Sequence, residues 1–330
     1  EGQIDVSNAT GSGGSAKVLG DRVALQGEAS IDASGAAGGG EILVGGNYQG
    51  SGEELNAVMT FVGADVLINA DAVTGGDGGT VIVWADDTTR YFGSISARGG
   101  SEAGDGGFAE ISGKESLVYR GSVYLSSATG VSGSVLFDPK NIVIADGGGG
   151  TVEDSDAFAD TTTSTVTIDA DSITTLTNAG TAVTLQANND ITINETINSS
   201  NAGAGGSIAL QAGRSILINA DITTDNGSFT AVANETTANG VVEANRDDSS
   251  MAVFTLGDGF TIDAGSGAIS ITMSTGAGGT GETSGDITLE NLITTGHILI
   301  VQDGQTDGSD ILRTSADSLL SATSIALDIS

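Results

Sequence analysis

The chain has 330 residues, with 43 acidic and 10 basic side chains and a net charge of −33 at neutral pH. A surface this acidic repels phosphate backbones and anionic lipids, which argues against nucleic acid as a partner. The lack of cysteine excludes a disulfide scaffold, 4% aromatic residues argue against a core built on large rings, and 38% hydrophobic residues are too many for a disordered chain.

A glycine-led strand pattern recurs through the first half of the chain. The glycine before the strand is Gly14, Gly40, Gly79, Gly107 or Gly133, so the spacings are 26, 39, 28 and 26 residues. A second alternating segment, residues 30–33, returns at 67–70, 94–97 and 122–125. Together with a third segment such as residues 23–25, these repeats give three short strands per 25–28 residues. The sequence therefore predicts an all-β parallel β-helix, or β-solenoid, with no helices.

The 39-residue spacing indicates about a dozen extra residues in one coil. We place them at residues 47–56, within a loop excursion near 45–60. A loop projecting from a solenoid is a usual place for a binding surface. The alternative, which we prefer, is a cap over one sheet.

The second half of the chain continues the pattern in a stricter register. We divide the chain into residues 1–145, and residues 146–330, whose coils loosen from residue 227 onward and include a loop at 276–285. The boundary falls in the glycine-rich segment 146–160, after the single proline. The 25-residue spacing predicts that Ile168, Ile193 and Ile218 lie directly above one another, and that Asn194 and Asn219 form a hydrogen-bonded amide ladder.

Several residues are candidates for a catalytic, sugar-binding or ice-binding site. Arg90 follows Asp86 and Asp87, but these fall at a turn, where a solvated ion pair is expected. Trp84 and Tyr91 suggest a sugar-stacking platform, although a place inside the coil or on its flank is preferred. The threonine run 161–165 suggests an ice-binding face, but the array breaks because the 25-residue register brings Thr167 to Thr192 and then to Leu217.

Metal and cofactor sites are not expected. His297 is the single histidine of a chain that has no cysteine, which argues against a transition metal. Asp77 and Asp105 lie in GDGG elements that suggest calcium, but the calcium-binding nonapeptide repeat is missing and an aspartate that bonds its own turn accounts for them. We predict no catalytic, cofactor-binding or metal-binding residues, and keep calcium as a minor alternative.

The repeats resemble a known family. The segments GGNYQGSGEELNAVMTFVGADVLINADAVTGGDGGTVIVWADDTTRYFGSISARGG, GDGGFAEISGK and GSVLFDPKNIVI resemble the haemagglutinin-like repeat region of filamentous-haemagglutinin-type bacterial exoproteins. The segments VTLQANNDITIN and IALQAGRSILIN are similar to the next block of these proteins. The resemblance implies a right-handed parallel β-helix, export by an outer-membrane two-partner-secretion transporter, and a place in the medium or at the bacterial cell surface. The family's amino-terminal secretion domain is missing here, so we expect an interior portion of a longer precursor or a processed subunit.

Two functions follow as expectations. The first is a structural or adhesive segment that mediates adhesion, aggregation or matrix formation, with a host-cell, glycan or matrix surface as partner. The second is a filament subunit, since neither end of the sequence shows a polar cap and uncapped coils favour end-to-end association or pairing with further repeats. A carbohydrate-active enzyme is a distant third, and we expect no enzymatic activity. No apolar run reaches the roughly 18 residues that span a bilayer, so membrane insertion is not expected.

Overall fold

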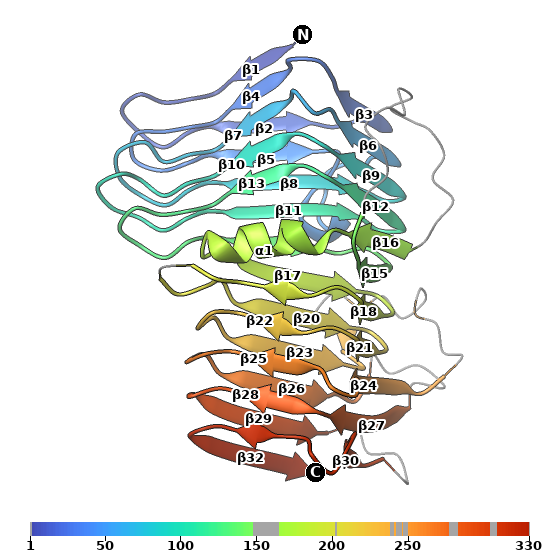
Figure 1. The fold of residues 1–330 in the computed structure, drawn as a ribbon. Helices are drawn as coiled ribbons and strands as arrows, with labels where there is room; N and C mark the ends of the chain where they lie inside the picture. The colour runs from blue at the N-terminus through green and yellow to red at the C-terminus, as the bar shows by residue number, and fades with distance from the viewer. Residues whose placement is uncertain are drawn as a thin grey trace. The chain divides into compact units, whose positions relative to one another are not determined.

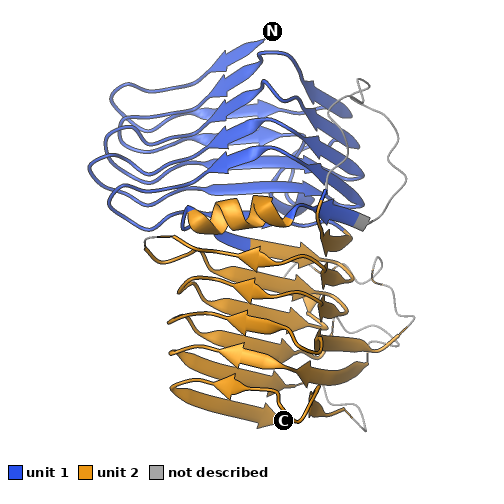
Figure 2. Ribbon diagram, in the orientation of Figure 1, with its two compact units in different colours: residues 1–139, 147–169, 179–183 blue, residues 140–146, 170–178, 184–330 orange. Residues whose placement is uncertain are grey.

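The computed structural model describes residues 2–147, 165–201, 203–237, 241, 246, 250–276, 283–303 and 309–329. It divides into two compact units, which Figure 2 colours separately. Unit 1 contains residues 1–139, 147–169 and 179–183, and unit 2 contains residues 140–146, 170–178 and 184–330. Each unit is a parallel β-solenoid in which most coils add one strand to each of three sheets. The predicted fold class is therefore confirmed.

In unit 1 the strands stack into sheets 1, 2 and 3 (Figure 1). Sheet 1 contains β1 (Gln3–Asp5), β4 (Ser30–Asp32), β7 (Leu67–Asn69), β10 (Ser94–Ser96) and β13 (Ser122–Tyr124). Sheet 2 contains β2 (Ser15–Val18), β5 (Glu41–Val44), β8 (Thr80–Ala85), β11 (Phe108–Gly113) and β14 (Ser134–Phe137). Sheet 3 contains β3 (Arg22–Leu25), β6 (Met59–Val62), β9 (Thr88–Tyr91) and β12 (Ser116–Tyr119). Strand β16 (Thr165–Ile168) also belongs to this unit.

In unit 2 the strands stack into sheets 4, 5 and 6. Sheet 4 contains β17 (Ala182–Ala187), whose first two residues belong to unit 1, β20 (Ile208–Ala212), β23 (Phe229–Ala233), β26 (Ile269–Met273), β29 (His297–Gln302) and β32 (Ser324–Ile329). Sheet 5 contains β15 (Asn141–Ile144), β18 (Ile191–Ile193), β21 (Ile216–Ile218), β24 (Ala252–Leu256), β27 (Ser284–Leu289) and β30 (Ile311–Arg313). Sheet 6 contains β19 (Ile197–Asn198), β22 (Ile222–Thr223), β25 (Thr261–Asp263), β28 (Asn291–Ile293) and β31 (Leu320–Ser321).

The glycines that lead the strands of sheet 2 lie where successive coils pass closest to one another. A Cβ atom on Gly107 would lie 2.1 Å from the carbonyl oxygen of Gly79, one coil away. A side chain at this position would force the coils apart, so only glycine permits the strand to enter the sheet in register. The predicted spacings of 26, 39, 28 and 26 residues are confirmed by the pairing of Ser15, Glu41, Thr80, Phe108 and Ser134.

The interior of each unit consists of rows of stacked apolar side chains. In unit 1, Ile31, Ile68, Ile95 and Val123 are aligned in sheet 1 and all are buried. The expectation of a core without large rings is wrong for sheet 3, where the rings of Tyr91 and Tyr119 are stacked with centroids 5.9 Å apart. Burying each large apolar side chain contributes about 1.5–3 kcal/mol, so these rows stabilise the coil stack.

The predicted stacking of isoleucines at a 25-residue spacing is correct for one of the two pairs. Ile193 pairs with Ile218 as predicted. On its other side, however, Ile193 pairs with Ile144 and not with Ile168. The reason is that β15, and not β16, is the neighbour of β18 in the sheet. After Ile168 the chain also forms a helix, α1 (Ala170–Asn178), which contradicts the expectation of a chain without helices.

Helix α1 packs against β19 and takes the place of a neighbouring strand. Its buried residues recur at helical spacing: Ala170, Ile173, Leu176 and Thr177. Its polar side chains accept hydrogen bonds from backbone N–H groups at the open edge of β19 and just after this strand. Thr174 Oγ1 accepts from the Asn198 backbone N–H at 3.3 Å, and Asn178 Oδ1 from the Ser200 N–H at 2.6 Å. The helix thereby satisfies backbone donors that a further strand would otherwise bind.

No helix in the part of the chain that the structure describes is long and apolar enough to cross a bilayer. The segment 146–160 and the threonine run lie almost wholly outside the described residues, as does most of the predicted loop 276–285. The last residues of that loop, Ser284 and Gly285, belong to β27 and not to a loop.

Candidate functional site

The outer face of sheet 1 carries a continuous row of polar side chains, which we call the ladder face. Asp5, Asp32, Asn69, Ser96 and Tyr124 are aligned one coil after another. The Asn69 side-chain amide donates to Asp32 Oδ1 at 3.2 Å, which joins two coils on the outside of the sheet. Alternation explains the row, because the residue before each member points inward and is apolar.

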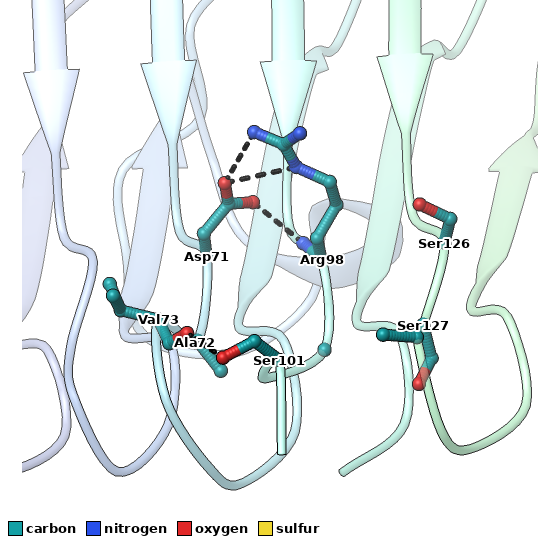
Figure 3. A pocket seen from close by; sticks show the side chains of 9 residues that line it. Asp71, Ala72, Val73, Arg98, Ser101, Ser126 and Ser127 are labelled. Atoms are coloured by element: carbon teal, nitrogen blue, oxygen red, sulfur yellow. Dashed lines mark hydrogen bonds and ion pairs between the residues drawn. The ribbon is translucent and has the colours of Figure 1, made fainter. Parts of the chain in front are cut away.

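An ion pair between Asp71 and Arg98 stands at the end of this face (Figure 3). Asp71 Oδ2 accepts from Arg98 Nη2 at 2.8 Å and from Nε at 3.1 Å. Asp71 Oδ1 accepts from the Arg98 backbone N–H at 2.7 Å and from the Ser96 hydroxyl at 2.6 Å. The carboxylate is thus held by four donors, and the guanidinium is fixed in one orientation. The Arg98 side chain is 55% exposed, so part of its donor fork faces solvent.

The ion pair borders a shallow groove of about 420 Å³. The turns that follow sheet 1 in three successive coils line it, and Figure 3 shows them side by side. The lining residues are Asp71, Ala72, Val73, Arg98, Gly99, Ser101, Ser126, Ser127 and Ala128. The Ser101 hydroxyl donates to the Val73 carbonyl at 3.0 Å, and the Ser127 hydroxyl to the Gly104 carbonyl at 2.6 Å. These bonds between coils keep the groove preformed.

Tyr124 is the aromatic residue of the ladder face. It lies beside Ser96, and its side chain is 53% exposed. Tyr124 belongs to the repeated segment 122–125, for which the sequence predicts a strand but no binding role. The signal was present, because Val123 is the inward residue of that strand and its neighbour must therefore point outward.

The sugar-stacking platform predicted from Trp84 and Tyr91 does not exist in this form, whereas the preferred place inside the coil or on its flank is confirmed. Tyr91 is fully buried inside the coil. Trp84 is on the outside of sheet 2 but only 4% exposed, because it packs with Leu43 and Ile82 beneath a covering loop. Neither ring is accessible to a ligand.

The covering loop is the predicted excursion, and the preferred role as a cap is confirmed. We call residues 45–57 the strap. The strap closes on itself through a hydrogen bond from the Ala57 N–H to the Gly45 carbonyl, 2.5 Å long. It contains a short 3-10 turn, η1 (Tyr48–Gly50), whose last residue lies directly on the indole of Trp84, since a Cβ on Gly50 would be 2.6 Å from the ring.

A buried acidic group lies beneath the strap. Glu110 is aligned with Leu43, Ile82 and Leu136 on the outside of sheet 2, and it is 0% exposed. Both carboxyl oxygens accept from the Gln49 backbone N–H, at 3.1 and 3.2 Å. Gln49 has φ 51° and ψ 33°, a left-handed conformation that is uncommon for a residue with a side chain.

The environment of Glu110 changes its protonation. Burial raises the pKa of Glu110 to about 8, and the negative charge of Asp138 adds to this increase while the Gln49 N–H opposes it. Burial also raises the pKa of Asp138 to about 7, against the hydrogen bond from the Gln49 side chain. Glu110 therefore retains its proton at neutral pH. The sequence does not predict the pair Glu110 and Asp138, because the residues next to Glu110 in the chain do not indicate that it is buried.

The remaining candidate residues have structural roles. Arg90 was expected in a solvated ion pair, which is wrong: the residue is 4% exposed and its guanidinium lies 5.9 Å from the ring centroids of Phe61 and Phe92. His297 is exposed and its Nδ1 lies 2.6 Å from the Ser324 hydroxyl. Thr192 pairs with Leu217, as expected from the break in the threonine array, but its neighbour on the other side is Val143 and not Thr167.

The predicted amide ladder is confirmed, since Asn219 Nδ2 donates to Asn194 Oδ1 at 3.0 Å. Asp77 and Asp105 were expected to accept hydrogen bonds within their own turns. Instead, each accepts a hydrogen bond from the next coil. Asp77 Oδ1 accepts from the Asp105 N–H at 2.8 Å, and Asp105 Oδ1 accepts from the Val131 N–H at 2.9 Å.

Among the described residues, no group of three or more histidine or acidic side chains is arranged to hold a metal ion. Neither a scan of the chain against protein-family models nor a search of curated proteins found a match.

Proposed function

We propose that this chain is a structural and adhesive segment of a bacterial extracellular or cell-surface protein. The observation that carries the proposal is the ladder face, where five coils present aligned polar side chains and one exposed ring on a rigid parallel stack. Strands spaced by about 4.8 Å give such a face a length of roughly 20 Å. A flat, repetitive surface of this kind suits contact with an extended partner.

The way in which the coils are joined supports the same proposal. Hydrogen bonds from side chains connect neighbouring coils at Asn69, at Asp77, at Asp105 and at Asn219, in addition to the backbone ladders. A chain held together in this way keeps its outer rows in fixed register, which an adhesive surface requires. The net charge of −33 keeps such a protein soluble in a cation-rich medium. Export by an outer-membrane transporter rests on the resemblance of the repeats alone.

Adhesion can be measured directly with the purified chain. Polystyrene beads coated with the chain, and albumin-coated control beads, are added to immobilised polysaccharides, immobilised matrix proteins and cultured cells, and retention under flow is counted. We expect retention of the coated beads on at least one surface. Retention equal to that of the albumin beads on every surface would refute the adhesive function. A parallel assay for newly formed reducing sugar ends tests the enzymatic alternative, and we expect none.

A filament is the second candidate, favoured by the strand at one edge of unit 2. All six residues of β32 (Ser324–Ile329) are exposed, including Ile325 at 44%, Leu327 at 57% and Ile329 at 61%. These residues continue the inward row of β29, and β32 pairs with β29 on one side. A further coil of the same precursor, or a second copy, fits that edge. Electron microscopy of the purified chain decides between the candidates, since only the filament candidate predicts long fibres from this sequence alone.

A further inference from the structure

We infer that the ladder face and the groove at its end form a binding site for a neutral, hydroxyl-rich polysaccharide, with one pyranose ring stacked on Tyr124 and the next hydrogen-bonded to the Asp71–Arg98 pair. The inference deepens the proposed adhesive function and rests on it for its biological role. The binding site itself stands on geometry in unit 1.

The stacking position comes from Tyr124. Its ring is 53% exposed in a row whose other members are Asp5, Asp32, Asn69 and Ser96. An exposed aromatic side chain offers a broad apolar surface with a polar tip, the combination that suits the C–H face of a sugar surrounded by hydroxyl groups. The neighbouring residues of the row have only small or polar side chains, so nothing in the row hinders the approach of a flat ring.

The hydrogen-bonding position comes from the ion pair. Arg98 Nε donates to the Ser96 hydroxyl at 3.0 Å as well as to Asp71, so Ser96 joins the pair to the strand beside Tyr124. Four donors occupy the Asp71 carboxylate and fix the guanidinium of Arg98, whose exposed N–H groups can donate to the hydroxyl oxygens of a sugar. The exposed Ser126 lies on the turn that follows Tyr124, at the border of the same groove.

The dimensions of the face favour a chain of sugars over a single ring. Successive coils repeat at about 4.8 Å, which is close to the length of one pyranose unit in an extended polysaccharide. The groove spans the turns of three coils in succession. A linear polysaccharide that runs across the coils would therefore place about one sugar unit on each coil.

The charge of the face selects a neutral ligand. Asp71 neutralises Arg98, and Asp5 and Asp32 add negative charge to the same face. The chain as a whole carries −33. Because this field repels carboxylate and sulfate groups, an acidic polysaccharide is disfavoured relative to a neutral one of the same length.

Isothermal titration of the full chain with hexasaccharides tests the inference. The probes are cellohexaose, maltohexaose and xylohexaose as neutral chains, and hexagalacturonate as the acidic chain. We expect saturable binding of at least one neutral probe and weaker binding of hexagalacturonate. Absence of saturable binding of all three neutral probes, or tighter binding of hexagalacturonate, would overturn the inference.

Three variants locate the site. Tyr124→Ala should lower the affinity about tenfold, and Tyr124→Phe, which keeps the ring, should bind nearly as the parent chain does. Leu67→Ala is the matched control, because Leu67 is 58% exposed on the same sheet but in another row. Circular dichroism verifies that each variant is folded. Equal loss of affinity in Tyr124→Ala and Leu67→Ala, or no loss in Tyr124→Ala, would exclude this site.

The bead assay separates this inference from the proposed function. If Tyr124→Ala loses hexasaccharide binding but its beads still adhere to matrix proteins or cells, the sugar site stands and adhesion uses another surface. If the parent chain adheres but binds no neutral hexasaccharide, the adhesive function stands and the sugar site is refuted. If it binds the sugar but coated beads adhere to no surface, the site stands without the adhesive role.

Discussion

Replacing Glu110 with glutamine should change the pH dependence of stability in a predictable direction. Glu110 is fully buried beneath the strap, and its pKa in the folded chain is about 8 in place of the usual 4.5. Between these two values the unfolded chain releases the proton while the folded chain keeps it. Stability must therefore fall as the pH rises from about 4.5 to about 8, and it levels off above that.

The magnitude follows from the same pKa values. Each pH unit between them corresponds to about 1.4 kcal/mol, so the full interval from 4.5 to about 8 amounts to about 5 kcal/mol. Glutamine cannot ionise, yet its side-chain oxygen still accepts from the Gln49 N–H. We expect Glu110→Gln to match the parent chain near pH 5 and to exceed its stability by roughly 3–5 kcal/mol at pH 9.

Urea unfolding at pH 5, 7 and 9 measures the effect, with the fluorescence of Trp84 as the signal. Trp84 is the single tryptophan, and it packs under the strap, so it reports on the site itself. Glu102→Gln is the control, because it is the same substitution at an exposed turn of the same unit. If the parent chain shows no decrease between pH 5 and pH 9, or Glu110→Gln retains the full decrease, the protonated state of Glu110 is refuted.

Three further changes test the contacts between coils and the strap. Asn219→Ala removes the amide bond to Asn194 and should lower the free energy of unfolding by about 0.5–1 kcal/mol in thermal or urea unfolding, with no further loss when Asn194 is also changed to alanine. Asp105→Ala removes the acceptor of an exposed backbone N–H in the next coil and should cost about 0.5–1.5 kcal/mol, whereas Asp105→Asn should cost less, and EDTA should not shift the melting temperature of the parent chain. Gly50→Ala, at φ +60° and against the indole, should shift the tryptophan emission to longer wavelength, and Gly52→Ala, at φ +86° but away from the ring, should not.

The coil architecture could be predicted from the sequence because every coil repeats the same local constraints. A glycine is needed wherever two coils approach closely, as at Gly107, and its spacing therefore counts the residues of a coil. Alternation then tells which residues of a strand point inward. Both signals are local, and so the register of sheets 1 and 2 was predicted correctly.

Helix α1 (Ala170–Asn178) was missed because its pattern is ambiguous over so short a length. Its buried residues fit a helix, but the same segment contains four β-branched residues among nine, which favours a strand. The apparent 25-residue spacing from Ile168 to Ile193 strengthened the wrong interpretation. The packing of the helix side chains against the open edge of β19 decides the structure, and no local signal reports that contact.

The candidate site was predicted only in part for a similar reason. The single long spacing between glycines predicted that residues 47–56 form a cap. It did not predict which residues lie beneath the cap. Glu110 is buried because the backbone of Gln49 reaches it from 61 residues earlier in the chain. Arg90 is buried beside the rings of Phe61 and Phe92, and its position next to the acidic residues in sequence does not predict this contact. When a segment far away in the sequence buries a charged residue, the residues next to it in the chain do not predict the burial.

The outer rows of unit 1 show which face has a cover and which has none. In sheet 2 the outer row runs from Lys17 through Leu43, Ile82, Glu110 and Leu136, and the strap lies over Trp84, which packs with Leu43 and Ile82. In sheet 1 the corresponding row is polar up to Ser96 and needs no cover. Tyr124 fits neither pattern, because a large ring ends the polar row and more than half of it is exposed. Folding gains little from an aromatic side chain left in water. Binding of a ligand that covers the ring would explain why an aromatic side chain occupies this exposed position.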